Sequence, residues 1–458
     1  MTGSLVPVLE ALDGLALAAT TEEVRSLASE LGSAARGPLR IAVAGRVKAG
    51  KSTLVNALLR QRVAPTAVGE CTKVVTWYSY GIPEQAVVVL KDGHREARAL
   101  QPDGSLHPDL PYPLEEVERL EVSLSIDALR NVTLIDTPGL ASTTTAASGA
   151  TRELLALDSS SRGAVAAADV LLLVLPVEPR SDEIDVLSRF DQAGGGTADI
   201  AARAAALSSS LLEDHRLQLA AVLPVNGLLA ETASCGVLNE RDVSALRELR
   251  DLGADRLRLL LLSADRFVSA GSDVPSSVRE RLLELLDLHG VERAVELVAT
   301  TDSAGPLTGA LLDHSGFDAL HREVFAGFAR HRDLHKASWV IGALLRAHVS
   351  DPADAARVRD VAERLLLDPD LHAVRVLRAL QSVVAGDVAL SPDLSDDLRR
   401  LADRLGVDPT APDAGQALPT AEAVAGVQRW RAVAGDVRSG PRLREVADIA
   451  VRAYENLL

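Results

Sequence analysis

Eight residues near the start of the chain have the composition of a loop that binds phosphate. Residues Gly45 to Ser52 read GRVKAGKS and match the pattern G-x-x-x-x-G-K-[ST]. Glycines allow the backbone to turn so tightly that successive N–H groups point at one anion. In such loops the lysine, here Lys51, reaches the terminal phosphates, and the hydroxyl of Ser52 is a ligand of Mg²⁺. The stretch therefore predicts a site for a nucleotide and a magnesium ion.

An aspartate further along the chain fits the metal-binding part of the same kind of site. Asp136 ends the apolar run VTLID and is followed by Thr137, Pro138 and Gly139. In phosphate-loop switch proteins, an acid at a strand end holds Mg²⁺ through water and the glycine N–H contacts the γ-phosphate. The small polar residues 141–150 come next. We expect them to form a switch segment that the γ-phosphate orders.

A threonine between these two motifs is expected to complete the metal site. The segment APTAVGECTKVV offers Thr66 and Thr72. Thr72 is favoured because it lies just before a predicted strand at Val74–Tyr78, so a mobile loop could bring its hydroxyl onto Mg²⁺. The alternative is that Thr72 only begins that strand.

The elements that must position these residues are those of an α/β domain. From Leu39 to about Val225, helical patterns alternate with the apolar runs IAVAG, VVTWYSYG, AVVVL, VTLIDTPG, DVLLLVLP and LAAVLPV. This alternation favours a mostly parallel sheet. The sequence KDG at Lys91–Gly93 is typical of a hairpin turn, so part of the sheet is expected to be antiparallel.

Helical patterns flank the predicted sheet on both sides. Residues 1–36 have apolar side chains at helical spacing, and after Gly227–Ala233 a helical pattern continues almost to Leu458. We therefore expect an α/β phosphate-loop domain plus an α-helical bundle. The predicted parts are N-terminal helices at 1–38, the nucleotide-binding domain at 39–330 and a helical domain at 331–458.

Composition narrows the class of protein. The 458 residues carry a net charge of −16, which argues against nucleic acid as a partner. Two cysteines, Cys71 and Cys235, are too few for a disulfide framework and fit a reducing cytosol. We expect no signal peptide, because the first residues lack a basic region and have acids within their apolar stretch. We expect no transmembrane helix, because no uncharged apolar stretch is long enough. These features predict a cytoplasmic location.

The motifs together resemble those of a known family. GRVKAGKSTLVNAL, APTAVGECTKVVTWY, LIDTPGL and VLPVNGLLAETA are similar to segments of bacterial dynamin-like GTPases. The similarity is greatest to their actinobacterial branch, with its isoniazid-inducible and sporulation-septum members. The resemblance implies GTP hydrolysis with Mg²⁺, with GTP and GDP as the bound nucleotides. It also implies a helical neck and trunk, in which the N-terminal helices pack beside the C-terminal ones.

The resemblance further implies partners and a site of action. Dimerisation would use the nucleotide-facing surface, either as a homodimer or as a heterodimer with a paralogous dynamin-like protein. The protein would act peripherally at the inner face of the cell membrane, directly or through a partner, in membrane remodelling or cell division. One alternative is a degenerate scaffold that binds nucleotide weakly and partners a more active paralogue. An ATPase is a further alternative.

Guanine recognition departs from the family pattern. Such GTPases read the base with [NT]-K-x-D, whereas the nearest candidate here is Ser188, Arg189, Phe190 and Asp191. Only VEPRSDEID separates this segment from the preceding strand pattern, although parallel strands are usually joined by a dozen residues or more. Either the usual connecting helix is missing, or SDEIDVLSRF is that helix and the base-reading strand is lost.

Lys48 is the second departure, because eukaryotic dynamins have a serine at this loop position that helps to hold a monovalent cation. Its ammonium could supply that charge during phosphoryl transfer, or it could simply be solvated. The candidate catalytic residues are Lys48, Lys51 and Thr72, and the candidate metal ligands are Ser52, Thr72 and Asp136. The candidate nucleotide-binding residues are Gly45, Arg46, Val47, Lys48, Ala49, Gly50, Lys51, Ser52, Thr53, Asp136, Gly139, Ser188, Arg189 and Asp191.

Overall fold

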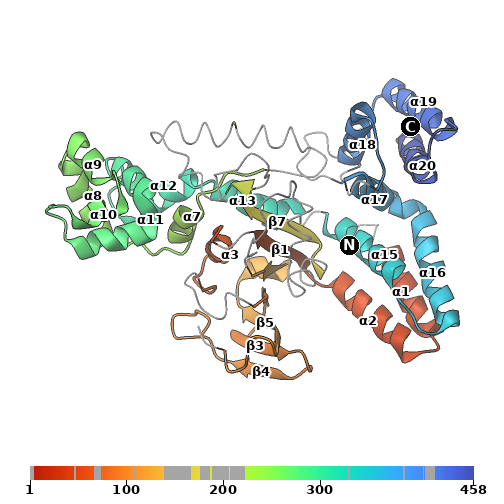
Figure 1. The fold of residues 1–458 in the computed structure, drawn as a ribbon, viewed down its shortest axis with the longest axis horizontal. Helices are drawn as coiled ribbons and strands as arrows, with labels where there is room; N and C mark the ends of the chain where they lie inside the picture. Colours follow the sequence, from red (N-terminus) through yellow and green to blue (C-terminus); the bar gives the residue numbers. More distant parts are fainter. Residues whose placement is uncertain are drawn as a thin grey trace. The chain divides into compact units, whose positions relative to one another are not determined.

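The computed structural model divides the chain into two compact units (Figure 1). The helical unit contains residues 1–39, 215–221 and 323–458, and the sheet unit contains residues 40–214 and 222–322. The residues that the structure describes are 5–45, 48–65, 74–107, 110–138, 167–175, 186–187, 206, 222–328, 331–384, 387–405, 407 and 418–457. The predicted fold class, a phosphate-loop α/β domain with a helical bundle, is confirmed.

A mixed β-sheet organises the sheet unit. Its strands are β1 (Leu39–Gly45), β2 (Thr76–Tyr80), β3 (Gln85–Leu90), β4 (Arg95–Arg98), β5 (Val117–Leu124), β6 (Val132–Asp136), β7 (Val170–Leu175) and β8 (Val186–Leu187). Within the described residues, their order is β4-β3-β5-β2-β6-β1-β7-β8. Strand β7 pairs in parallel with both β1 and β8, and β2 pairs in parallel with β5. The β3–β4, β3–β5 and β2–β6 pairs are antiparallel.

Two expectations about individual strands had different outcomes. The predicted turn at Lys91–Gly93 joins the antiparallel strands β3 and β4, and Gly93 supplies the positive φ of 88° that the turn requires. The expected strand LAAVLPV is wrong over Val222–Val225, which form no regular element. Pro224 has no N–H to donate to a strand ladder, which explains why an apolar run is not sufficient there.

The described part of the sheet unit also contains helices. They are α3 (Lys51–Leu59), η2 (Asp127–Arg130), α7 (Gly227–Ser234), α8 (Glu240–Asp251), α9 (Ala254–Leu260), α10 (Ala264–Ser269), α11 (Ser276–Leu297), α12 (Ala304–His314) and α13 (Phe317–Arg322). A leucine-rich core joins α7, α8, α10, α11 and α12 through residues such as Leu229, Leu246, Phe267, Leu282 and Leu307. Helix α7 also packs against α3, the helix that follows the phosphate loop.

The helical unit is assembled from both ends of the chain. Its elements are α1 (Val6–Ala18), α2 (Glu22–Arg36), η4 (Glu323–Gly327), α15 (Arg332–Arg346), α16 (Pro352–Leu367), η5 (Pro369–Leu371), α17 (His372–Val384), α18 (Pro392–Arg404), α19 (Thr420–Gly435) and α20 (Pro441–Asn456). One hydrophobic core runs from Leu5 to Tyr454. Helix α1 packs on α16 and α2 on α15, so the N-terminal helices lie beside C-terminal ones.

Polar contacts fix the N-terminal helices within this unit. The carboxylate of Asp354, in the first turn of α16, accepts hydrogen bonds from the N–H groups of Thr20 and Thr21 and from the Thr21 hydroxyl, at 2.6–3.2 Å. Arg332 donates to the carbonyl oxygens of Arg36 and Gly37 at the end of α2. Within the described ranges, no helix has both the length and the apolar character needed to cross a membrane.

Candidate nucleotide site

The phosphate loop and Asp136 meet at one edge of the sheet. Gly45 ends β1 and Asp136 ends β6, and these strands are neighbours. The N–H and hydroxyl of Thr137 both donate to the carbonyl oxygen of Val43, at 3.2 and 2.9 Å, which fixes the exit of β6 against β1. Ligands of open α/β sheets bind beyond such strand ends.

Backbone geometry explains the two glycines of the loop. Gly45 has φ +145°, and a Cβ there would overlap the carbonyl oxygen of Val174 on β7. Gly50 has φ +93° and immediately precedes α3, so the chain enters the helix from a left-handed conformation. Lys48 also has a positive φ, +66°, which is uncommon for a residue with a side chain. The loop is therefore tightly folded where the sequence predicts a phosphate.

The side chain of Lys51 reaches back to Gly45, at the start of the phosphate loop. Its side chain is 7% exposed, and its ammonium donates a hydrogen bond to the carbonyl oxygen of Gly45 at 3.0 Å. Burial lowers the pKa of Lys51, and the nearby carboxylate of Asp136 opposes that effect. A buried ammonium held at the start of a helix is well placed to bind the oxygen atoms of a phosphate.

Ser52 and Asp136, two of the predicted magnesium ligands, are in direct contact. The Ser52 hydroxyl donates to Oδ2 of Asp136 at 2.9 Å. The other carboxylate oxygen, Oδ1, is buried and has no hydrogen-bond partner among the described residues. Burial raises the pKa of Asp136 to about 6, although Ser52 and Lys51 lower it. A hydroxyl beside an unsatisfied carboxylate oxygen matches the oxygen ligands that Mg²⁺ prefers, so the residues present fit this ion.

Asn56 organises the other end of α3, and sequence reasoning missed it. Its Oδ1 accepts from the N–H groups of Val63 and Ala64 at 3.0 and 2.7 Å. Its Nδ2 donates to the carbonyl oxygen of Ala64 at 2.9 Å and to Oε1 of Glu231 at 2.8 Å. This side chain fixes the segment that leads towards residues 66–73. A lone amide among the apolar residues of TLVNALL was the available signal.

Glu231 on α7 accepts a hydrogen bond from Asn56 on α3 and so connects the two helices. The side chain of Glu231 is buried, and burial raises its pKa, while Asn56 and Arg62 oppose that shift. The guanidinium of Arg62 lies 3.7 Å from Oε2 of Glu231. Helix α3 is thus joined by buried polar groups to the helices beyond the sheet.

Strand β8 bears on the prediction of guanine recognition. Val186 and Leu187 pair in parallel with Val174 and Leu175. The alternative that SDEIDVLSRF is entirely a connecting helix is therefore wrong at these two residues. Tertiary pairing with β7 holds them extended, despite the short linker. Strand β8 therefore runs in the same direction as β7 and β1.

The remaining predicted site residues are divided between described and undescribed parts of the chain. Lys48 is exposed, Ala49 is buried, and Thr53 is half-buried in the first turn of α3. The predicted residues that lie outside the described ranges are Arg46, Val47, Thr72, Gly139, Ser188, Arg189 and Asp191.

The fold and the site together define a phosphate-loop nucleotide-binding protein. Comparisons with known proteins identify its family. Residues 41–188 match the Dynamin family. The chain is 33% identical over 461 residues to the isoniazid-induced protein IniC of Mycobacterium tuberculosis H37Rv, covering 93% of this chain and 91% of that protein. The chain therefore belongs to the bacterial dynamin-like proteins.

Two more distant similarities were also found. A bacterial dynamin-like protein of Nostoc punctiforme is 27% identical over 124 residues, which is 23% of this chain and 17% of that protein. A solved structure described as an oligomerised bacterial dynamin pair is 12% identical, with a TM-score of 0.32, and covers 100% of this chain and 95% of that one. A TM-score this low supports no inference about this chain.

Proposed function

We propose that the chain binds GTP together with Mg²⁺ and hydrolyses it, either weakly alone or with the help of a partner. The observation that carries the proposal is the contact between Ser52 and Asp136 beside Lys51. Magnesium would be held by Ser52, Asp136 and Thr72, and when bound it would offset the negative charge of the phosphates. Family membership supports guanine as the base.

Different residues of the site would bind different parts of the nucleotide. Lys51 would exchange its hydrogen bond with Gly45 for one with a phosphate oxygen. Backbone N–H groups between Gly45 and Thr53 would hold the remaining phosphate oxygens. Lys48, exposed on the loop, would place a positive charge near the bridge between the β and γ phosphates. Asp191, which follows β8 in the sequence, would accept hydrogen bonds from the guanine ring.

The wider function follows from the family. We infer dimerisation through the nucleotide-facing surface, with a second copy or with a paralogue. Residues 39–330 would be the GTPase domain, with 1–38 and 331–458 as neck and trunk. GTP-dependent association of this kind would serve membrane remodelling at the inner face of the cell membrane, including the division septum. Packing of α1 and α2 against α15 and α16 supports a common neck.

A second candidate function is a scaffold that binds nucleotide poorly and partners an active paralogue. The specific observation that favours it is SRFD in place of [NT]-K-x-D at Ser188–Asp191. Without a guanine reader the protein would distinguish GTP from ATP weakly or bind neither.

Calorimetric titration of the full chain with GTP, GDP and ATP, with and without Mg²⁺, separates these functions. We expect saturable binding of GTP and GDP that strengthens with Mg²⁺, weak binding of ATP, and release of phosphate from GTP at high protein concentration. No detectable binding of any nucleotide would favour the scaffold. Equal affinity for ATP and GTP would show that the base reader is absent.

A further inference from the structure

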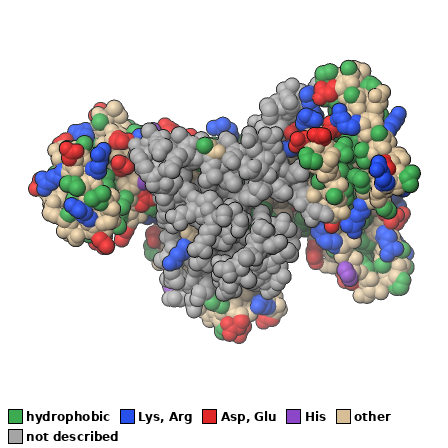
Figure 2. All heavy atoms as spheres, turned by 45° about the horizontal axis from the view of Figure 1, so that its top comes forward, with side chains coloured by type: hydrophobic (Ala, Val, Ile, Leu, Met, Phe, Trp, Pro, Cys, Tyr) green, Lys and Arg blue, Asp and Glu red, His purple; other side chains and the backbone are tan. Residues whose placement is uncertain are grey.

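A pocket of about 950 Å³ lies within the helical unit, separate from the nucleotide site. Helices α15, α16, α17 and α20 supply its walls. Apolar side chains, including Leu345, Leu367 and Ile449, line part of it, and arginines line another part. Leu345 and Leu367 are 43% and 68% exposed, so the pocket has an apolar margin open to solvent. Figure 2 shows basic side chains among hydrophobic ones on one face of this unit.

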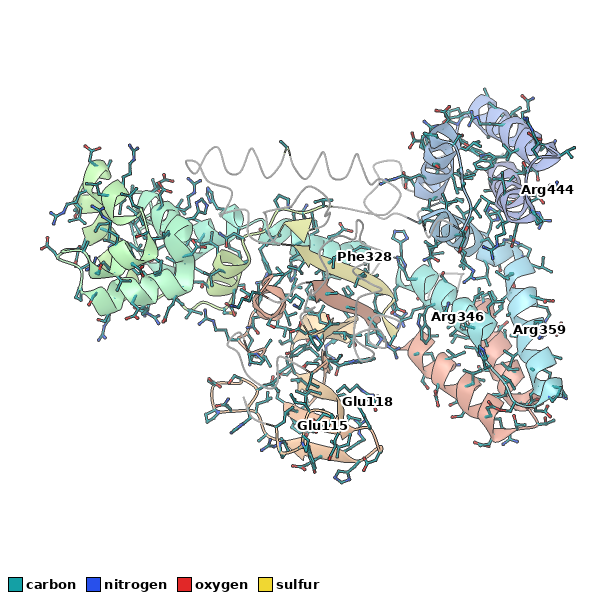
Figure 3. All side chains as sticks on the ribbon, viewed as in Figure 1. Glu115, Glu118, Phe328, Arg346, Arg359 and Arg444 are labelled. Carbon is teal, nitrogen blue, oxygen red and sulfur yellow. The ribbon has the colours of Figure 1, made fainter. Side chains whose placement is uncertain are left out.

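Three of the arginines that line the pocket come from two helices, and a fourth arginine, from a third helix, lies beside one of them. Arg375 and Arg378 come from α17, Arg452 from α20 and Arg346 from the end of α15, where Figure 3 labels it. The Nη1 atoms of Arg346 and Arg378 lie 3.1 and 3.3 Å from the position of a Cβ built on Gly342. Both guanidinium groups therefore share the space left beside that glycine.

Arg375 and Arg378 are half-buried, whereas Arg346 and Arg452 are exposed. Within the described residues, no Asp or Glu oxygen lies within 4 Å of Arg346, Arg375, Arg378 or Arg452. Arg375 instead donates to the carbonyl oxygen of Leu366 and contacts Nδ1 of His372. The acids that line the pocket are Glu363, Asp387, Glu445 and Asp448, all of which are exposed. Asp387 is paired with Arg442 at 3.5 Å.

Burial and neighbouring positive charges disfavour the charged forms of the two half-buried arginines. Arg375 and Arg378 are half-buried, and burial lowers the pKa of both. The positive charge of Arg452 lowers the pKa of Arg375 further, and that of Arg346 does the same to Arg378. The carboxylates of Asp368 and Glu445 oppose these shifts at Arg375 and Arg378, respectively. Like charges in a partly desolvated site repel, and a polar ligand of opposite charge would satisfy them.

We propose that this pocket binds the phosphate group of an organic phosphate, with the guanidinium groups of Arg375, Arg378 and Arg452 around the phosphate and the ligand's apolar portion against Leu345 and Leu367. Guanidinium groups present N–H donors in a planar fork that suits phosphate oxygens. Several positive charges that line one pocket match a phosphate better than a single carboxylate. The phosphate group can belong to a soluble metabolite or to a lipid head group, because both present the same oxygens.

The test uses the full chain with Lys51→Ala, which removes the phosphate loop as a competing site. Pyrophosphate is titrated by calorimetry, and flotation compares vesicles of phosphatidylglycerol in phosphatidylcholine with phosphatidylcholine alone. Arg452→Gln and the double variant Arg375→Gln, Arg378→Gln are compared with Arg359→Gln. Arg359 is an exposed arginine of α16 outside the pocket lining (Figure 3). Arg452 is also exposed, so its substitution leaves the core intact even if the double variant misfolds.

We expect either probe to bind, with affinity falling about 10-fold or more in Arg452→Gln and remaining unchanged in Arg359→Gln; this is the scale of one lost charge-assisted hydrogen bond. Pyrophosphate binding would identify a soluble ligand, and binding confined to phosphatidylglycerol vesicles would identify a lipid head group. The proposal is overturned if neither probe binds, or if binding survives both pocket variants. Tighter binding of an oligoglutamate peptide than of either probe would also overturn it, in favour of an acidic protein partner.

Discussion

Replacing Asn56 by alanine tests whether the buried amide holds the phosphate-loop helix to its surroundings. The substitution removes four hydrogen bonds of 2.7–3.0 Å and leaves two backbone N–H groups, one carbonyl oxygen and Glu231 without this partner. Each buried bond contributes about 1 kcal/mol net, and an unsatisfied partner costs about 1–3 kcal/mol. Because water reaches some of these groups after truncation, we expect a total loss of roughly 3–5 kcal/mol.

Urea unfolding followed by circular dichroism measures this loss, with Asn131→Ala as the matched control. Asn131 is an exposed asparagine of the same unit, so its replacement should leave the unfolding free energy nearly unchanged. Glu231→Gln on its own and combined with Asn56→Ala completes a double-mutant cycle, and we expect the two effects to be non-additive. A loss below about 1 kcal/mol in Asn56→Ala, with an unchanged m-value, would refute the argument that these bonds stabilise the site.

Four further predictions concern the nucleotide site. Lys51→Ala should abolish GTP binding in calorimetry with little change in melting temperature, and unchanged affinity would contradict the phosphate-loop assignment. Lys48→Ala should lower kcat by about 10²–10³ while GTP affinity changes much less; a loss confined to KM would exclude a role in the transition state. Because burial raises the pKa of Asp136 to about 6, its carboxyl is protonated below that pH, so Mg²⁺-dependent affinity for GTP should rise with pH through about 6 and then level off. An affinity that is flat across this range, or that falls, would count against Asp136 as a metal-binding group. Asp191→Asn should weaken GTP and strengthen xanthosine triphosphate, whose 2-oxo group accepts from the new amide, and an unaltered preference would exclude Asp191 as the base reader.

The raised pKa of Asp136 also affects the stability of the folded protein. A pKa raised above that of the unfolded chain means that the folded state binds a proton more tightly, so this group opposes folding as pH rises towards about 6 and above. Without nucleotide or metal, Asp136→Asn should therefore raise the melting temperature at neutral pH and have little effect in strong acid. A variant less stable than the wild type at neutral pH would show that the charged carboxylate is stabilised by groups other than Ser52 and Lys51.

The sequence predicts local structure where a short run of residues is sufficient to determine the backbone conformation. The run from Gly45 to Ser52 needs only glycines, a lysine and a helix start, and the structure has these in the predicted places. The turn at Gly93 belongs to the same class. Asp136 was predicted at a strand end, but its burial depends on β1 and α3 and could not be read from its own segment.

Features that depend on distant partners were missed or left open. Asn56 is a polar residue in an apolar helix, and its role appears only when Glu231, far along the chain, lies beside it. Strand β5 contains three charged residues in VERLEVSL, and its alternation of buried and exposed side chains becomes meaningful only between β2 and β3. Val186 and Leu187 are too few to predict as a strand without their neighbour β7.

The contact between Thr21 and Asp354 has a consequence for how the protein is made. These residues are 333 positions apart, and the core around them contains α1 and α2 from one end of the chain and α15 to α20 from the other. At a synthesis rate of about 5–20 residues per second, the N-terminal helices leave the ribosome roughly 20–70 s before α16 does. During that interval α1 and α2 have each other but none of their partners from the C-terminal part of the unit, because residues of the sheet unit are produced in between. Helices α1 and α2 are thus among the last elements of the helical unit to complete their native contacts, although they are made well before α15 to α20.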